Sequence, residues 1–116
     1  MYRSLSLIFV LLTVLLGSCQ QDPTVEGRWA FDKVDAGTQN PAKTFEFLGG
    51  TFSEGYSDMC FTDLQPVGQY SFDGSHLQVF ATNGCSYNLV YLADYKAIFD
   101  IKDSTGSVTR AVYIRP

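Results

Sequence analysis

The sequence has few of the residues that build most catalytic and metal sites, because it contains one histidine and three cysteines. A single imidazole excludes a metal site built from several histidines. His76 follows an Asp73-Gly74 turn signal and alternates with Leu77, so we interpret it as a solvent-facing strand residue. Neither a phosphate-binding glycine loop nor an EF-hand loop is present. We therefore expect no catalytic residues, no metal, no cofactor and no enzymatic activity.

Positive charge is also scarce, since the sequence contains eight Lys and Arg residues but twelve Asp and Glu residues, which gives a net charge of −4. Nucleic-acid binding needs a basic surface, and this composition excludes it. The same deficit gives no electrostatic attraction to anionic membranes.

Long apolar runs are absent except at the N-terminus, where Leu5 to Leu16 is almost entirely apolar. Arg3 precedes this run and small residues follow it, which is the pattern of a secretory signal peptide. The run is shorter than the roughly 20 residues of a membrane-spanning helix, which is one alternative. An ordinary signal peptide with an incidental cysteine is the other.

The segment Leu16-Gly17-Ser18-Cys19 resembles the lipobox of bacterial lipoproteins. The resemblance implies removal of residues 1–18 and a lipidated Cys19 that carries acyl chains such as palmitate. Gln20 in place of aspartate favours the outer membrane, and the periplasmic and surface faces both stay open. Residues 19–25 then form a short tether, and residues 26–116 form one small domain.

If Cys19 carries the lipid, Cys60 and Cys85 are the two cysteines that remain to form a disulfide. An exported chain enters an oxidising compartment, so we expect a Cys60–Cys85 disulfide, with two free buried thiols as the alternative. The bridge would stabilise the fold by roughly 3.5 kcal/mol in the chain-entropy model.

The mature chain alternates apolar and polar residues in short segments separated by turn signals such as Asp73-Gly74 and Asn83-Gly84. No helical period is present. Consecutive hairpins predict an all-β, antiparallel up-and-down barrel of about eight strands, because closure removes exposed edges. The expected strands are 27–34, 44–47, 51–53, 58–62, 68–72, 76–81, 87–92, 95–101 and 108–115.

Two motifs resemble a known family. Gly27-Arg28-Trp29 resembles the glycine-x-tryptophan start of lipocalins and of short lipocalin-like domains in Bacteroidota lipoproteins. Residues 68–79 resemble the hairpin typical of those short domains. The resemblance implies a lipocalin-like barrel, although the chain is shorter than transport lipocalins and lacks their C-terminal helix. We expect Trp29 to close one end of the barrel as a buried plug.

Aromatic residues make up 15% of the chain. An eight-stranded barrel is either filled by side chains or holds one small ligand, and both outcomes stay open. If a ligand binds, the candidate lining residues are Trp29, Phe31, Phe45, Phe47, Tyr70, Phe72, Tyr87, Tyr91 and Phe99.

Asp103-Ser104-Thr105 resembles a short O-glycosylation signal of Bacteroidota envelope proteins, with Ser104 as the modified residue. An Asx-type turn is the alternative.

These observations predict a lipid-anchored, non-enzymatic envelope protein that binds a small apolar or amphipathic ligand. The alternative is a protein-interaction module, such as an inhibitor or accessory subunit, with a filled barrel core.

Overall fold

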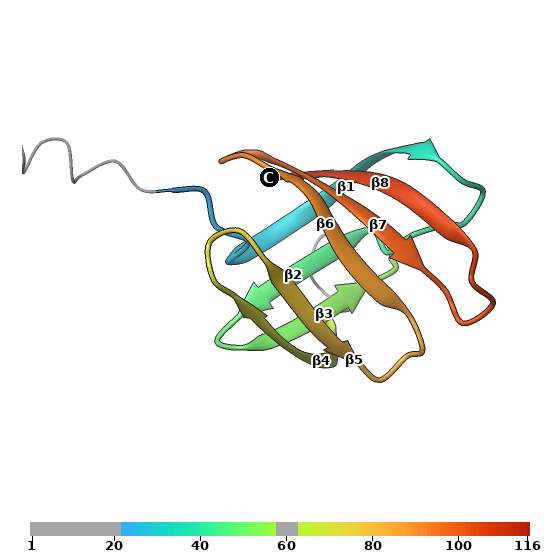
Figure 1. Cartoon of the computed structure of the whole chain (residues 1–116), viewed down its shortest axis with the longest axis horizontal. Helices are drawn as coiled ribbons and strands as arrows, with labels where there is room; N and C mark the ends of the chain where they lie inside the picture. The colour runs from blue at the N-terminus through green and yellow to red at the C-terminus, as the bar shows by residue number, and fades with distance from the viewer. Residues whose placement is uncertain (1–21, 58–62) are drawn as a thin grey trace, which may run out of the picture.

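The computed structural model describes residues 22–57 and 63–116, and these form one antiparallel sheet of eight strands (Figure 1). The strand order is β5-β4-β3-β2-β1-β8-β7-β6, which confirms the predicted all-β, up-and-down barrel. The strands are β1 (Gly27–Ala36), β2 (Thr44–Leu48), β3 (Thr51–Gly55), β4 (Gln65–Phe72), β5 (Leu77–Ala81), β6 (Ser86–Leu92), β7 (Lys96–Lys102) and β8 (Val108–Ile114).

The barrel is nearly closed, because the first strand pairs with the last. The first half of β1 pairs with β2 and its second half pairs with β8, with register shifts near Lys33 and Ala36. Such bulges bend a strand and let it turn a barrel corner. Within the described part of the chain, β5 and β6 follow one another but are not hydrogen-bonded neighbours. We call this gap between β5 and β6 the open seam.

The two ends of the barrel are distinct (Figure 1). At the tether end, residues 22–26 enter the barrel, and the turns 49–50, 73–76 and 93–95 and residues 115–116 lie around them. At the far end lie the loop 37–43, the turns 82–85 and 103–107, and the exit of β3.

The core is a cluster of aromatic rings supplied by alternating strand positions. Phe45 and Phe47, two residues apart on β2, are both fully buried. The Phe45 ring stacks on Tyr113 with centroids 4.1 Å apart and also contacts Phe52, Tyr87 and Phe99 edge-on. These offset and edge-to-face arrangements are the favourable geometries for aromatic pairs.

Two strand predictions need correction. β4 begins at Gln65 and includes Pro66, whereas the sequence predicted a strand only from Gly68. Pro66 is tolerated because it pairs with Ser53 beside a register shift, where the regular ladder is interrupted. His76 lies in the turn before β5 and not in the strand.

The predicted strand 58–62 and the two cysteines Cys19 and Cys60 lie outside the described residues. Across residues 22–57 and 63–116, no helix combines the length and apolar character needed to cross a membrane.

Candidate functional site

Most of the predicted ligand-lining residues face the barrel interior, where they contact one another. Fully or nearly fully buried are Trp29, Phe45, Phe47, Tyr70, Tyr87 and Phe99, and Phe31 and Phe72 are partly buried against them. Tyr91 differs, since half of its surface is exposed. A register shift between Leu89 and Tyr91 breaks the alternation of β6 and turns the Tyr91 ring outward. The prediction that Tyr91 faces the barrel interior is therefore wrong.

Trp29 is fully buried near the tether end. Its indole N–H donates to the Val25 carbonyl at 2.8 Å, and the Arg115 guanidinium lies 4.0 Å from the centre of its ring. A cation at this distance is attracted to the ring face. Gly27 leaves room for this arrangement, because a Cβ there would lie 2.8 Å from Arg115 Nη1.

Arg115 fixes the entering chain to the barrel. Its guanidinium donates to the carbonyls of Thr24, Glu26 (2.7 Å) and Asp94 (2.8 Å). Burial lowers the pKa of Arg115. Tyr70 adds a hydrogen bond from its hydroxyl to the Glu26 carboxylate.

Val25 is fully buried, so the last residue of the predicted tether belongs to the folded core. The Arg115 guanidinium also binds the Thr24 carbonyl, so the barrel holds the chain from Thr24 onward.

At the far end, the carboxylate of Glu54 is buried, with only 5% of the residue exposed. Its Oε1 accepts from the Tyr87 hydroxyl at 2.6 Å and from Asn83 Nδ2 at 2.9 Å. The Tyr56 hydroxyl lies 3.4 Å from Oε2. Burial raises the pKa of Glu54, and the hydrogen bonds from Tyr87, Tyr56 and Asn83 oppose this rise. Burial, followed by the charge of Glu54, also raises the pKa of Tyr56 to about 12.

These contacts cross the barrel interior from β3 to β6 and to the turn 82–85. Since β5 and β6 are not paired, the Glu54 contacts link the seam-lining strand β6 to the opposite part of the sheet. Glu54 lies just beyond the predicted strand 51–53, because the sequence Ser53-Glu54-Gly55 resembles the beginning of a turn. In the structure Glu54 belongs to β3, where four consecutive residues are buried.

The exit of β3 is held by Asp63, whose Oδ2 accepts the backbone N–H groups of Tyr56 (3.0 Å) and Ser57 (2.8 Å). These hydrogen bonds, with that from Ser57 the largest cause, lower the pKa of Asp63. Gly55 is required at this point, because a Cβ would lie 2.3 Å from Thr44 Oγ1 and 2.5 Å from Asp63 Oδ1. Both of these oxygens are buried, and neither has a hydrogen-bond partner among residues 22–57 and 63–116.

His76 lies exposed in the β4–β5 turn, beside Ser75 and Asp73. Its Nδ1 lies 3.0 Å from Ser75 Oγ and 3.6 Å from Asp73 Oδ2. A serine triad needs the two partners on opposite ring nitrogens, and here both face Nδ1. Among the described residues, no group of three or more His, Cys, Asp or Glu side chains is placed to hold a metal.

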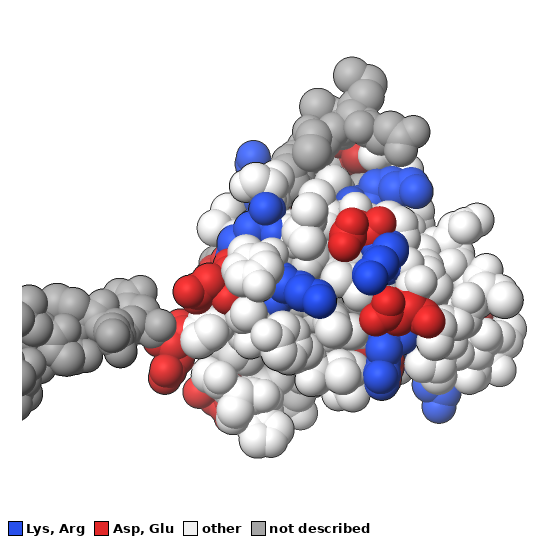
Figure 2. Space-filling model, turned by 90° about the horizontal axis from the view of Figure 1, so that it is seen from above, with Lys and Arg blue, Asp and Glu red and all other residues white. Residues whose placement is uncertain are grey.

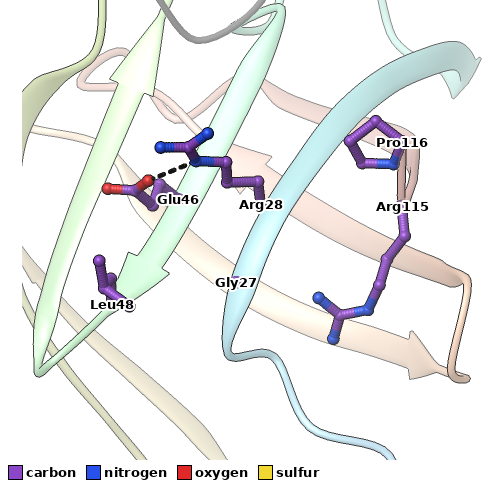
Figure 3. A pocket seen from close by; sticks show the side chains of 6 residues that line it. All are labelled: Gly27, Arg28, Glu46, Leu48, Arg115 and Pro116. Atoms are coloured by element: carbon purple, nitrogen blue, oxygen red, sulfur yellow. Dashed lines mark hydrogen bonds and ion pairs between the residues drawn. The ribbon is translucent and has the colours of Figure 1, made fainter.

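Two hollows of about 450 and 440 Å³ open on the outer surface. The first lies at the tether end, where Arg28 and Glu46 form an ion pair of 2.8 Å (Figure 3). Its lining residues are Gly27, Arg28, Glu46, Leu48, Arg115 and Pro116. The second is lined by Ser71, Phe72, Asp73, His76, Leu77 and Gln78. Acidic and basic side chains alternate over the face seen in Figure 2, which shows no broad patch of one sign.

The strands beside the open seam carry three large apolar side chains that face solvent. Phe80 on β5 is 61% exposed, and Val90 and Tyr91 on β6 are 41% and 50% exposed. We call Phe80, Val90 and Tyr91 the seam residues.

Cys85 is partly buried and has no disulfide partner among residues 22–57 and 63–116, and burial raises the pKa of its thiol. Because Cys60 lies outside the described residues, the Cys60–Cys85 disulfide stays a prediction. Ser104 is exposed in the β7–β8 turn. Asp103 forms the Asx-type turn there, accepting the N–H groups of Thr105 and Ser107.

No protein-family model, curated protein or solved structure matches the chain. The fold itself defines the class: a small all-β protein with a nearly closed, eight-stranded antiparallel barrel.

Proposed function

We propose that this chain is a lipid-anchored, non-enzymatic protein of the cell envelope that binds another envelope protein through the open seam. The observation that carries the proposal is the aromatic interior, in which buried rings contact one another. The barrel then acts through its outer surface, as an inhibitor or accessory subunit does.

The cellular location rests on the N-terminal sequence. The lipobox-like segment before Cys19 supports lipidation, and Gln20 favours the outer membrane. The Gly27-x-Trp29 start, together with the barrel, supports a resemblance to the lipocalin-like domains of Bacteroidota lipoproteins.

The packing of the interior argues against a ligand among the predicted lining residues. Phe45 alone contacts five other rings, at centroid distances from 4.1 to 6.3 Å. Small barrels with large inward-facing side chains are filled, and a ligand would have to displace these contacts.

The open seam supports protein binding. Edge strands present unpaired backbone groups to which an extended segment of another protein can add as a strand. The seam residues supply exposed apolar surface beside these edges, with Phe80 near the turn 82–85 and Val90 and Tyr91 near the turn 93–95.

Site-specific photo-crosslinking in the native host tests this proposal. A p-benzoylphenylalanine at the position of Phe80 should yield one dominant adduct with one envelope protein. The matched control places the same group at Lys33, an exposed residue of β1 that lies on the paired side of the barrel. Tyr91→Ala should reduce the Phe80 adduct several-fold. Equal adducts at both positions, or none, would contradict the proposal.

A second candidate function is binding of a small amphipathic ligand in the tether-end hollow. Its volume of about 450 Å³ is within the usual range for ligand sites, and Leu48 lies opposite the Arg115 guanidinium (Figure 3). A compound that co-purifies with the wild-type chain and is lost from Leu48→Glu would favour this function.

A further inference from the structure

We propose that the tether end of the barrel lies against the lipid bilayer, with Leu48, Tyr95 and Ile114 in contact with the headgroup region. This inference rests on the lipid anchor proposed at Cys19. It goes beyond the anchor because it assigns a second, non-covalent contact between the folded domain and the membrane.

The first argument is the length of free chain. Arg115 binds the carbonyl of Thr24, and Val25 is buried, so the barrel holds the chain from Thr24 onward. Only residues 20–23 separate Thr24 from Cys19. At about 3.5 Å per residue, this segment reaches at most roughly 17 Å when fully extended. Part of that reach is used in crossing the headgroup layer, which adds roughly 5–8 Å on each side of the hydrocarbon core.

The second argument is the position of the exposed apolar side chains. Tyr95 is 69% exposed, Leu48 60% and Ile114 38%. All three border the point where the chain enters: the Tyr95 carbonyl accepts the Arg115 N–H, Ile114 precedes Arg115, and Leu48 lines the same hollow as Arg115. A short tether thus keeps these side chains close to the membrane surface, together with the turns 49–50, 73–76 and 93–95 at the same end.

The chemistry of these side chains suits the headgroup region. Tyrosine has an apolar ring and a polar tip, and it is enriched at membrane–water interfaces for that reason. Leu48 and Ile114 add apolar area on either side of the entering chain.

Charge contributes little to this contact. Arg28 at this end is paired with Glu46, and the Arg115 guanidinium is bound to backbone carbonyls. The acidic residues Glu26 and Asp94 lie beside them. We therefore infer a contact with neutral headgroups that anionic lipid does not strengthen.

Quenching by brominated phosphatidylcholine tests the inference on the mature, lipidated protein in phosphatidylcholine vesicles. In Tyr95→Trp, the added tryptophan should lose most of its emission when the lipid is brominated. The matched control is Phe80→Trp, which adds a tryptophan at a similarly exposed position of β5, beside the far-end turn. The emission of this added tryptophan should be unchanged. Leu48→Trp repeats the test at a second tether-end position.

Three results would overturn the inference: equal quenching of Tyr95→Trp and Phe80→Trp, quenching of neither, or a blue shift of Tyr95→Trp without quenching, which indicates burial by protein. Vesicle flotation and the mass of the peptide containing Cys19 test the anchor separately. A chain that floats but shows no selective quenching refutes only the membrane contact, whereas an unlipidated chain refutes the anchor as well.

Discussion

The two ends of the barrel are stabilised by different chemistry. At the tether end, Arg115 and the indole of Trp29 donate to backbone carbonyls. At the far end, the buried carboxylate of Glu54 accepts from Tyr87 and Asn83. Neither an indole nor a guanidinium changes charge near neutral pH, whereas a buried carboxyl can. The comparison indicates that the Trp29 and Arg115 contacts at the tether end keep their charge near neutral pH, whereas the contacts of the Glu54 carboxyl at the far end depend on its protonation.

Loss of the tether-end plug should have the largest effect. Trp29→Ala removes a fully buried indole, so we expect the free energy of unfolding to fall by about 3–5 kcal/mol. Trp29→Phe keeps part of the packing but loses the hydrogen bond to Val25, and it should lose less. Urea unfolding measures both variants. Equal stability of Trp29→Ala and wild type would contradict the assigned role of the plug.

Loss of the far-end carboxylate should have the next largest effect. Glu54→Leu removes the acceptor of the Tyr87 hydroxyl and one of the two acceptors of the Asn83 amide, which also donates to Tyr87 Oη at 2.8 Å, and this should destabilise the fold by about 2 kcal/mol. Glu54→Gln, the matched control, retains an acceptor oxygen and should be at least as stable as wild type at neutral pH. If both variants lose the same stability in urea unfolding, the account of the hydrogen bonds is wrong.

Arg115→Ala should lower the free energy of unfolding by about 1–2 kcal/mol, because it removes hydrogen bonds to three carbonyls and the contact with Trp29. Arg115→Lys keeps the charge but cannot reach all three acceptors, so it should recover only part of the loss. Hydrogen exchange should show faster exchange of residues 24–29 in Arg115→Ala, while the far end keeps its protection. A uniform change over both ends would contradict the local role of Arg115.

The smallest effect concerns pH. Because the folded-state pKa of Glu54 lies above its ordinary value of 4.5, the native state binds this proton more tightly than the unfolded chain does. The contribution of Glu54 to stability is therefore fully present below pH 4.5 and is lost as pH rises through the raised pKa.

The stability of Glu54→Gln relative to wild type should accordingly increase from pH 4.5 towards neutral pH. The difference in stability between Glu54→Gln and wild type does not contain the contributions of Asp63 and Asp103, because these are the same in both proteins. Their pKa values are lowered, so their contributions change with pH in the direction opposite to that of Glu54. Urea unfolding at each pH measures the difference in the free energy of unfolding between the two proteins. A difference that stays constant with pH would contradict this prediction.

Local patterns in the sequence predicted most of the fold. Asp73-Gly74 and Asn83-Gly84 lie in turns, and alternation placed Phe45 and Phe47 on the interior face. Three features depend on long-range geometry and could not be predicted in this way. Arg115 binds the carbonyl of Glu26, 89 residues away. A register shift turns Tyr91 outward, and Glu54 is buried only because β6 lies across the barrel from β3.

We infer that the barrel is filled and acts through its outer surface. Native mass spectrometry of the lipidated protein isolated from its host membranes tests this claim most directly. We expect the mass of the lipidated chain, with a stoichiometric protein partner and without any small apolar compound. A chain that retains one small apolar compound and no protein partner would contradict it.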